Sequence, residues 1–415
     1  MDRFTVITWE KVTIADVADE VTVGHVGPMA SEYVDKGIPF LRSLNIEPFN
    51  IRCDGVKFIA PSFHKRLQKS SLRPGDVVIV RTGKPGTCAV IPDWLLEANC
   101  SDVVIVRCSE RIRPRFLCYV VNSVAGHHIS SHIVGAVQQH FNVGSARTLE
   151  FLLPSIEEQD AILAILGSLD DKIDLNRRTN ETLEAMARAL FRDWFVDFGP
   201  TRTKMAGEAP YLAPELWKLF PDRLDDEGKP EGWHIASIDF LCRITSGKRP
   251  PNKETSPSDE NPIPVYGGNG ISWFTEDILF DQAFLITGRV GTLGTVFRVN
   301  EKCWVSDNAL CLFPKIDSYF EYLYFIISGI DFQILNSGST QPLLTQSSLS
   351  SQECILPAEE IIRIFHAQVS VWFEKQQQLE KESHTLAQLR DLLLPKLMSG
   401  EISIRDAEKM VEDVA

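Results

Sequence analysis

The chain of 415 residues is built from two similar halves, and this duplication limits its fold more than any other feature. The segments VRTGKPGT (80–87) and ITGRVGT (286–292) share the pattern Thr-Gly-basic-x-Gly-Thr, and each closes a short apolar run. Further similar pairs follow the same order: 9–24 with 233–247, 100–108 with 305–313, 114–123 with 321–329, and 135–162 with 338–364. An ordered series of matches predicts a repeated structural unit, with about twenty extra residues in the first copy, inside 45–66.

Each copy is predicted to contain an α/β domain followed by a long helix, so the expected fold class is α+β with two tandem, similar domains. Short β-branched runs broken by Gly and Pro, such as DVVIV (76–80) and AFLIT (283–287), predict strands. Ser155 and Glu158 form a capping box at the start of the first long helix. The predicted boundaries are 1–154 and 232–357 for the domains, 155–198 and 358–398 for the helices, 199–231 for a connector, and 399–415 for a C-terminal tail.

Apolar residues recur every three or four positions along both predicted helices, which indicates that the helices pair as a coiled coil. The interface positions are Leu166, Leu169, Ile173, Leu183, Leu190 and Trp194 in the first helix, and Phe365, Trp372, Leu379, Leu386 and Leu389 in the second. Asn176 and Asn180 fall in the same seam, where a polar group costs stability but fixes register, unless they face solvent at a splayed end. The alternative is two separate amphipathic helices, each packed against its own domain.

The net charge of −14 argues at first against nucleic acid as a partner, but the charge is unevenly distributed. Residues 1–150 hold 17 basic and 15 acidic side chains, whereas the remaining residues hold 25 and 41. Because phosphates respond to the local potential, the sequence allows a local basic surface on an acidic protein. A helix of about 30 residues is about 45 Å long, and a turn of B-DNA is about 34–36 Å. Two unlike domains held by such helices would read two different half-sites.

The repeated loops are the first candidates for DNA contacts, because glycine lets the backbone approach closely while Lys, Arg and Thr can reach phosphates or base edges. The predicted DNA-binding residues are Arg81, Thr82, Lys84, Thr87, Gln138, Lys248, Arg249, Thr287, Arg289, Thr292 and Gln341. The alternative for the loops is a strand-connecting turn with an exposed basic residue. Lys248 and Arg249 could equally lie in a solvated charged loop, and Gln138 and Gln341 could bond adenine or only backbone.

Motifs for catalysis are missing from the sequence. It contains no GxxxxGK[ST] phosphate loop, no GxGxxG after a strand, and no Asn/Asp-Pro-Pro-aromatic motif of amino-methyltransferases. The histidines of GHHISSH (126–132) favour an ordinary histidine cluster over a metal site, and the nine scattered cysteines favour reduced thiols. The sequence has no apolar run of membrane-spanning length and no signal peptide, so we expect a cytoplasmic protein. Because the motifs for catalysis are missing, we expect a binding protein that is not an enzyme and holds no cofactor or metal.

Three segments resemble the specificity subunit of type I restriction–modification systems. These are LPSIEEQDAILAILGSLDDKIDLNRRTNETLEAMARALFRDWFVDF (153–198), LAQLRDLLLPKLMSGEISI (386–404) and KPEGWHIASIDFLCRITSGKRP (229–250). The resemblance implies that each α/β domain is a target recognition domain that reads half of a split, asymmetric DNA site. It also implies that the long helices form an antiparallel coiled coil that sets the spacing between the halves.

The same resemblance implies partners. Two modification subunits would bind this chain and supply S-adenosylmethionine and adenine N6 methylation, and motor or restriction subunits would add ATP-driven, magnesium-dependent translocation and cleavage. The competing hypothesis is a duplicated coiled-coil interaction scaffold without DNA specificity. Domain 232–357 holds 8 basic and 13 acidic residues, so it needs a concentrated basic face or help from partner subunits to bind DNA.

Overall fold

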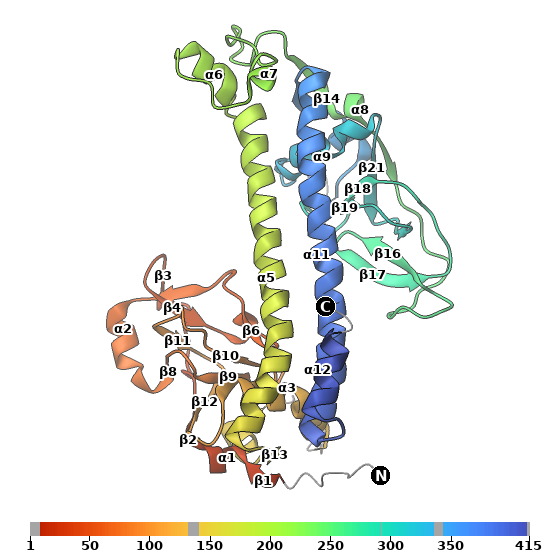
Figure 1. Cartoon of the computed structure of the whole chain (residues 1–415). Helices are drawn as coiled ribbons and strands as arrows, with labels where there is room; N and C mark the ends of the chain where they lie inside the picture. The colour runs from red at the N-terminus through yellow and green to blue at the C-terminus, as the bar shows by residue number, and fades with distance from the viewer. Residues whose placement is uncertain (1–8, 132–140, 292, 336–342, 413–415) are drawn as a thin grey trace. The chain divides into compact units, whose positions relative to one another are not determined.

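The computed structural model describes residues 9–131, 141–291, 293–335 and 343–412, which form two compact units. Unit 1 comprises Met1–Arg177 with Glu380–Ala415, and unit 2 comprises Arg178–Leu379. Figure 1 shows two long helices, α5 (Ile156–Phe195) and α11 (Glu359–Ser399). Each helix is divided between the two units, at 177–178 in α5 and at 379–380 in α11. Contacts therefore group each α/β domain with parts of both helices, whereas the predicted boundaries follow the order of the sequence.

Each unit contains one α/β domain, which we call domain 1 (from β1 to β13) and domain 2 (from β14 to β22). Both begin and end with strands that pair antiparallel with each other and lead into a long helix. In domain 1 these are β1 (Glu10–Thr13) and β13 (Glu150–Leu153); in domain 2 they are β14 (His234–Ser237) and β22 (Glu353–Leu356). The two ends of each domain thus meet beside the start of its helix.

The main sheet of the two domains is the same, which confirms the duplication. Four antiparallel strands lie in one order in each domain. They are β2 (Ala18–Val23), β12 (Val103–Cys108), β9 (Val77–Val80) and β10 (Cys88–Val90) in domain 1, and β15 (Cys242–Ser246), β21 (Ala309–Pro314), β18 (Phe284–Gly288) and β19 (Val296–Val299) in domain 2. The central strands are buried on both faces, as their continuous β-branched runs predict.

A smaller sheet in each domain is built around a parallel pair. In domain 1, β4 (Ile38–Leu41) pairs with β11 (Ala98–Cys100), and in domain 2, β16 (Ile263–Gly267) pairs with β20 (Trp304–Val305). A third strand lies antiparallel to the first of each pair. It is β7 (Lys57–Ile59) in domain 1 and β17 (Gly270–Thr275) in domain 2.

Equivalent helices connect the main sheet of each domain with its terminal pair of strands. In domain 1 they are α1 (Ile14–Val17), α3 (Pro114–Ser131) and α4 (Val143–Arg147), and in domain 2 they are α8 (Ile238–Leu241), α9 (Phe320–Ser328), preceded by η3 (Asp317–Tyr319), and α10 (Gln346–Ser350). Side chains of Asn142 and Thr345 cap α4 and α10 by accepting the backbone N–H of the third helical residue. Between α5 and β14, unit 2 also contains α6 (Gly199–Met205) and α7 (Pro214–Trp217).

The extra residues of domain 1 lie in two connections. Between β4 and β7 the chain runs through residues 42–56, whereas only 268–269 join β16 to β17. Between β7 and β9 it runs through 60–76, compared with 276–283 in domain 2. These connections hold η1 (Ser43–Asn45), β5 (Ile46–Glu47), β6 (Asn50–Ile51), α2 (Pro61–Arg66), η2 (Gln68–Ser70) and β8 (Ser71–Leu72); β3 (Tyr33–Val34) precedes β4. About twenty extra residues were expected here from the sequence.

The long helices pack antiparallel within each unit. The capping box of Ser155 and Glu158 begins α5, with the Glu158 N–H donating to Ser155 Oγ at 3.3 Å and the Ser155 N–H to Glu158 Oε2 at 2.9 Å. In unit 1, Asp170 meets Arg390 and Asn176 meets Glu382, so the partner number rises as the α5 number falls. The distances are 2.8 Å in both pairs.

The helices are also antiparallel in unit 2, because the Asn180 amide donates to the Gln376 carbonyl at 3.4 Å, whereas the lower-numbered Phe365 packs against the higher-numbered Phe191 in an aromatic core. Phe365 of α11 is fully buried against Phe191, Trp194 and Phe195 of α5, with ring centroids 5.1 to 6.1 Å apart. Aromatic pairs at these separations stabilise packing beyond the area that they bury. The expected pairing of the two helices is therefore confirmed inside each unit.

The predicted seam residues divide by burial. Eleven positions were predicted, and the buried ones are Leu166, Leu169, Trp194, Phe365, Leu379, Leu386 and Leu389, while Ile173, Leu183, Leu190 and Trp372 are half-buried. Asn176 is only 2% exposed, which places it in the seam as expected.

The sequence predicted Trp372 as a seam residue, but its neighbour Phe373 is the more deeply buried of the two. The next residue, Phe373, is 4% exposed, and the Arg298 guanidinium carbon lies 3.2 Å from the centre of its ring. Domain 2 packs on this part of α11, and a straight α-helix drifts by about 20° per heptad from a 3.5-residue repeat. The buried face therefore follows the domain and not the heptad.

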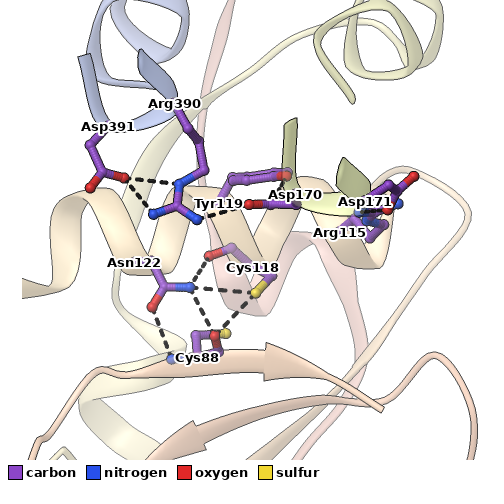
Figure 2. Close-up of polar contacts among 9 residues, drawn as sticks. All are labelled: Cys88, Arg115, Cys118, Tyr119, Asn122, Asp170, Asp171, Arg390 and Asp391. Carbon is purple, nitrogen blue, oxygen red and sulfur yellow. Dashed lines mark hydrogen bonds and ion pairs between the residues drawn. The ribbon is translucent and has the colours of Figure 1, made fainter. Parts of the chain in front are cut away.

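Domain 1 is fastened to both helices of unit 1 through α3 (Figure 2). The Tyr119 hydroxyl donates to Asp170 of α5, and Arg390 of α11 donates to the same carboxylate. Burial, together with the Asp170 carboxylate, raises the pKa of Tyr119, so the phenol remains a donor. The Arg390 guanidinium also lies 4.5 Å from the ring centre of Phe49 in the β5–β6 turn.

The C-terminal tail contains a further helix, α12 (Ile404–Glu412), whose Ala407 is fully buried in the unit 1 core. Among the described residues, no helix is long and apolar enough to cross a membrane.

Candidate nucleic-acid interface

The repeated loop of domain 1 leaves the carboxyl end of β9 as a tight, glycine-dependent turn. Gly83 and Gly86 both have a φ of +85°, a conformation that side chains with a Cβ rarely adopt. The Gly86 N–H donates to the Val80 carbonyl at 3.0 Å and the Thr87 N–H to the Lys84 carbonyl at 3.2 Å. These bonds hold the backbone closed and leave Lys84 exposed at the tip of the loop.

Asp102 ties the base of this loop to two neighbouring segments. Its carboxylate accepts the hydroxyl of Thr82 and lies 3.8 Å from the Arg81 guanidinium, while its backbone carbonyl accepts the Ser43 hydroxyl at 3.2 Å. Asp102 itself has a φ of +59° in the turn between β11 and β12. The carboxyl ends of β4, β9 and β11 therefore meet at one edge of domain 1.

Domain 2 brings its own loops together at the equivalent edge. The Arg289 guanidinium donates to Ser246 Oγ at 3.4 Å, and the Gln346 amide of α10 donates to the same oxygen at 2.9 Å. The Arg289 backbone N–H donates to the Asn308 carbonyl at 2.9 Å. Because Ser246 directly precedes Gly247 and the exposed Lys248, the two predicted contact loops of this domain lie next to each other.

A close backbone approach fixes the edge in both domains. Gly24 follows β2 and donates to the Val103 carbonyl at 2.9 Å, and Gly247 follows β15 and donates to the Ala309 carbonyl at 3.1 Å. A Cβ on Gly247 would lie 2.2 Å from the Ser306 carbonyl oxygen. The next residues, His25 and Lys248, occupy equivalent positions and present different side chains. We call the two regions the loop edges of domain 1 and domain 2.

The structure places the predicted contact residues in different environments. Lys84, Lys248 and Arg249 are exposed, and the half-buried ones are Arg81, Thr82, Thr87 and Arg289. Thr287 is fully buried and its hydroxyl has no hydrogen-bond partner among the described residues, so we correct the expectation that it reaches DNA. It is the fourth residue of β18, a strand that is buried on both faces. Gln138, Thr292 and Gln341 lie outside the described residues.

Several residues of the loop edges were not predicted from sequence. Ser43, Asp102, Ser246, Asn308 and Gln346 hold the loops in place. His25 is half-buried at the loop edge of domain 1. A sequence signal for Asp102 exists, because the Ser-Asp pairs 101–102 and 306–307 occupy the same place in the matched segments 100–108 and 305–313. Among the described residues, no cluster of His, Cys, Asp and Glu is suited to hold a metal ion.

Known proteins resemble this chain over most of its length. A family model described as "Type I restriction modification DNA specificity domain" matches residues 7–185 and 230–385. The chain is 29% identical over 321 residues to the type I restriction enzyme HindI specificity subunit of Haemophilus influenzae, covering 62% of this chain and 70% of that protein. It is 28% identical over 285 residues to the MjaIX specificity subunit of Methanocaldococcus jannaschii, covering 63% of this chain and 62% of that protein.

A solved structure shows the same fold. The S subunit of a type I restriction–modification system from M. genitalium superposes with a TM-score of 0.57 at 15% identity, covering 96% of this chain and 98% of that one. The two family-model matches cover both α/β domains and the greater part of both long helices. The chain therefore belongs to the family of type I restriction–modification DNA specificity proteins.

Proposed function

We propose that the chain is the DNA-recognition subunit of a type I restriction–modification complex, and that each loop edge reads one part of a bipartite, asymmetric site. The observation that carries this proposal is the pair of equivalent loop edges, built on one topology but lined by different side chains. Lys84 and His25 at one edge stand against Arg289 and Lys248 at the other. Side chains that differ at equivalent positions favour different base sequences.

The exposed cations of the loop edges can contact either phosphates or the edges of bases. Lys84 is exposed on a turn with two positive-φ glycines, and the exposed Lys248 and Arg249 directly follow Gly247; from these positions they can reach a duplex laid across the edge. Arg289 is held by Ser246, which preorganises its guanidinium for a phosphate or a guanine edge. Phosphate contacts would fix the position of each domain on DNA, and groups directed at the grooves would select the sequence.

We also propose the partners and cofactors. Two modification subunits would bind the chain and carry S-adenosylmethionine, and restriction or motor subunits would carry ATP and magnesium. The chain itself would be non-catalytic, bind no cofactor and act in the cytoplasm. Its relatives in Haemophilus influenzae and Methanocaldococcus jannaschii are named as specificity subunits of type I restriction enzymes, which supports this division of labour.

The experiment that tests DNA binding is a titration of the complex with fluorescent duplex at several salt concentrations. Neutralising several phosphates makes the logarithm of the association constant fall with the logarithm of salt, with a slope of about −0.9 per contact. We expect a steep slope. An interaction scaffold without DNA specificity would give weak binding with a slope near zero, and that outcome would refute the proposal.

A further inference from the structure

Domain 1 carries a basic insert that domain 2 does not have. The insert comprises residues 60–75 between β7 and β9, with α2, η2 and β8. It contains Lys65, Arg66, Lys69 and Arg73, which are all exposed, and no Asp or Glu; the buried Asp76 follows it and ends the connection to β9. In domain 2 the connection 276–283, which is described throughout, holds none of these elements and no Lys or Arg.

Buried polar groups fix the insert to the sheet. Asn99 of β11 is fully buried; its amide nitrogen donates to the Leu67 carbonyl at 3.1 Å and lies 3.2 Å from His64 Nδ1, and its oxygen accepts the Ser70 hydroxyl at 2.7 Å. The Glu97 carboxylate lies 3.1 Å from His64 Nε2. A satisfied buried polar network of this kind specifies one arrangement. The insert is therefore held in place along its length, whereas a solvated charged loop would not need such anchors.

The insert also contacts the loop edge of domain 1. The Phe63 ring of α2 meets the His25 ring edge-on with centroids 6.0 Å apart, and the Arg66 guanidinium carbon lies 4.9 Å from the centre of the Phe63 ring. The His25 N–H donates to the Cys100 carbonyl at 2.7 Å, two residues before Asp102. Figure 1 draws α2 on the side of domain 1 that faces away from α5. The helix α2, which carries Lys65 and Arg66, therefore lies beside the loop edge, and α5 does not cover it.

Charge complementarity identifies the occupant of this surface. Arg66 lies 3.8 Å from Glu32, but within the described part of the chain Lys65, Lys69 and Arg73 form no ion pair. Arg73 shares the charge of the buried Asp76 carboxylate with Arg107, so the insert still carries an excess of positive charge. Exposed cations on a fixed scaffold, in a chain of net charge −14, favour a polyanion. The nearest predicted polyanion is the duplex at the loop edge.

We propose that residues 60–75 form a phosphate-contacting element that extends the DNA footprint of domain 1 beyond its loop edge. Lys65, Lys69 and Arg73 contact backbone phosphates flanking one half-site, and the other half-site receives no equivalent contacts. The inference rests on the proposed DNA-recognition function. Because phosphate contacts carry no sequence information, the insert raises affinity and leaves the recognised sequence unchanged.

The test compares two triple variants of the full chain, assembled with its modification subunits and titrated with a 40-base-pair duplex of random sequence. The first is Lys65→Gln/Lys69→Gln/Arg73→Gln. The control is Lys218→Gln/Lys302→Gln/Lys409→Gln, which removes the same charge from exposed lysines away from both loop edges. Each lost phosphate contact reduces the magnitude of the salt slope by about 0.9, so we expect the insert variant to lose about 2 to 3 from the slope and about tenfold or more in affinity. The control keeps the wild-type slope.

Ethylation interference gives a second readout, because it shows which DNA phosphates the complex needs for binding. It uses a duplex that contains the sequence motif methylated by the complex. We expect interfering phosphates on the outer side of one half-site only, and their loss in the insert variant. If wild type binds with a steep slope and the insert variant has the same slope and the same interference pattern, the inference is overturned and the proposed function stands. If wild type shows no salt-dependent binding, the proposed function fails and the inference with it.

Discussion

Replacing Gly247 by alanine is expected to destabilise unit 2 and to displace its loop edge. The new Cβ would lie 2.2 Å from the Ser306 carbonyl oxygen and 2.4 Å from that of Val305. Both atoms belong to the backbone, so neither can rotate away as a side chain would. Overpacking of this kind typically costs about 1–3 kcal/mol. In a unit of about 200 residues, each kcal/mol lowers Tm by about 2–4 °C, so we expect a loss of about 2–12 °C.

The same substitution elsewhere provides a control of opposite sign. A Cβ on Gly167, inside α5, would meet only the end of the Arg115 side chain at 3.5 Å, which is ordinary contact. Alanine is favoured over glycine within a helix by about 0.5–1 kcal/mol, so Gly167→Ala is expected to raise Tm slightly. Gly24→Ala should have an intermediate effect, because its Cβ would lie 2.9 Å from Cys100 Sγ and 3.0 Å from the Cys100 carbonyl oxygen.

Calorimetry of the purified chain and duplex titration of the complex measure the two consequences. Gly247→Ala should lower the Tm of unit 2 and weaken DNA binding, since Lys248 follows directly and its N–H donates to the Val305 carbonyl at 2.8 Å. A Tm within about 1 °C of wild type together with unchanged DNA affinity would refute the argument that this backbone approach builds the edge.

Three other predictions follow from the same structure. Lys84→Ala and Arg289→Ala should each weaken DNA binding and reduce the magnitude of the salt slope by about 1, and equal slopes in wild type and both variants would exclude the loops from the interface. Inserting one matched heptad into α5 and α11 should change the gap between the two parts of the methylated motif, and an unaltered gap in active protein would contradict a spacing role for the helices. The hydrogen bond with the buried Glu321 carboxylate raises the pKa of His366, so its stabilisation is complete below the ordinary histidine pKa of about 6.5 and is lost as pH rises through the higher folded value. The Tm of the wild type should therefore fall as pH rises from about 6.5 through the folded-state pKa of His366, and the Tm of His366→Gln should fall much less. If Tm changes with pH to the same extent in both proteins, the His366–Glu321 pair is not linked to folding.

Local signals in the sequence predicted much of the fold. The capping box of Ser155 and Glu158 depends on residues three apart, and the strands that hold the repeated loops are continuous β-branched runs. Both features are set within a few residues, so neither needs knowledge of the tertiary structure. The duplication added the equivalence of the two domains, which is a property of the whole chain that can still be read from one sequence.

The remaining features depend on contacts between distant segments. Phe373 is buried in place of Trp372 because domain 2 packs there, and Thr287 is buried because its strand lies in the middle of the main sheet. Gln346 reaches Ser246 across 100 residues of chain, and no short motif announces that contact. Residues at the ends of strands are brought together by topology, so the contents of a loop edge become visible only in the folded chain.

Adenine-methylation mapping tests the central claim most directly. Genomic DNA is compared from cells that contain the cognate modification subunit with and without this chain. We predict methylation that depends on the chain and falls on a split motif, with two short unlike parts separated by a fixed gap. Methylation that is absent, independent of the chain, or confined to one continuous motif would contradict the claim that two unlike loop edges read a bipartite site.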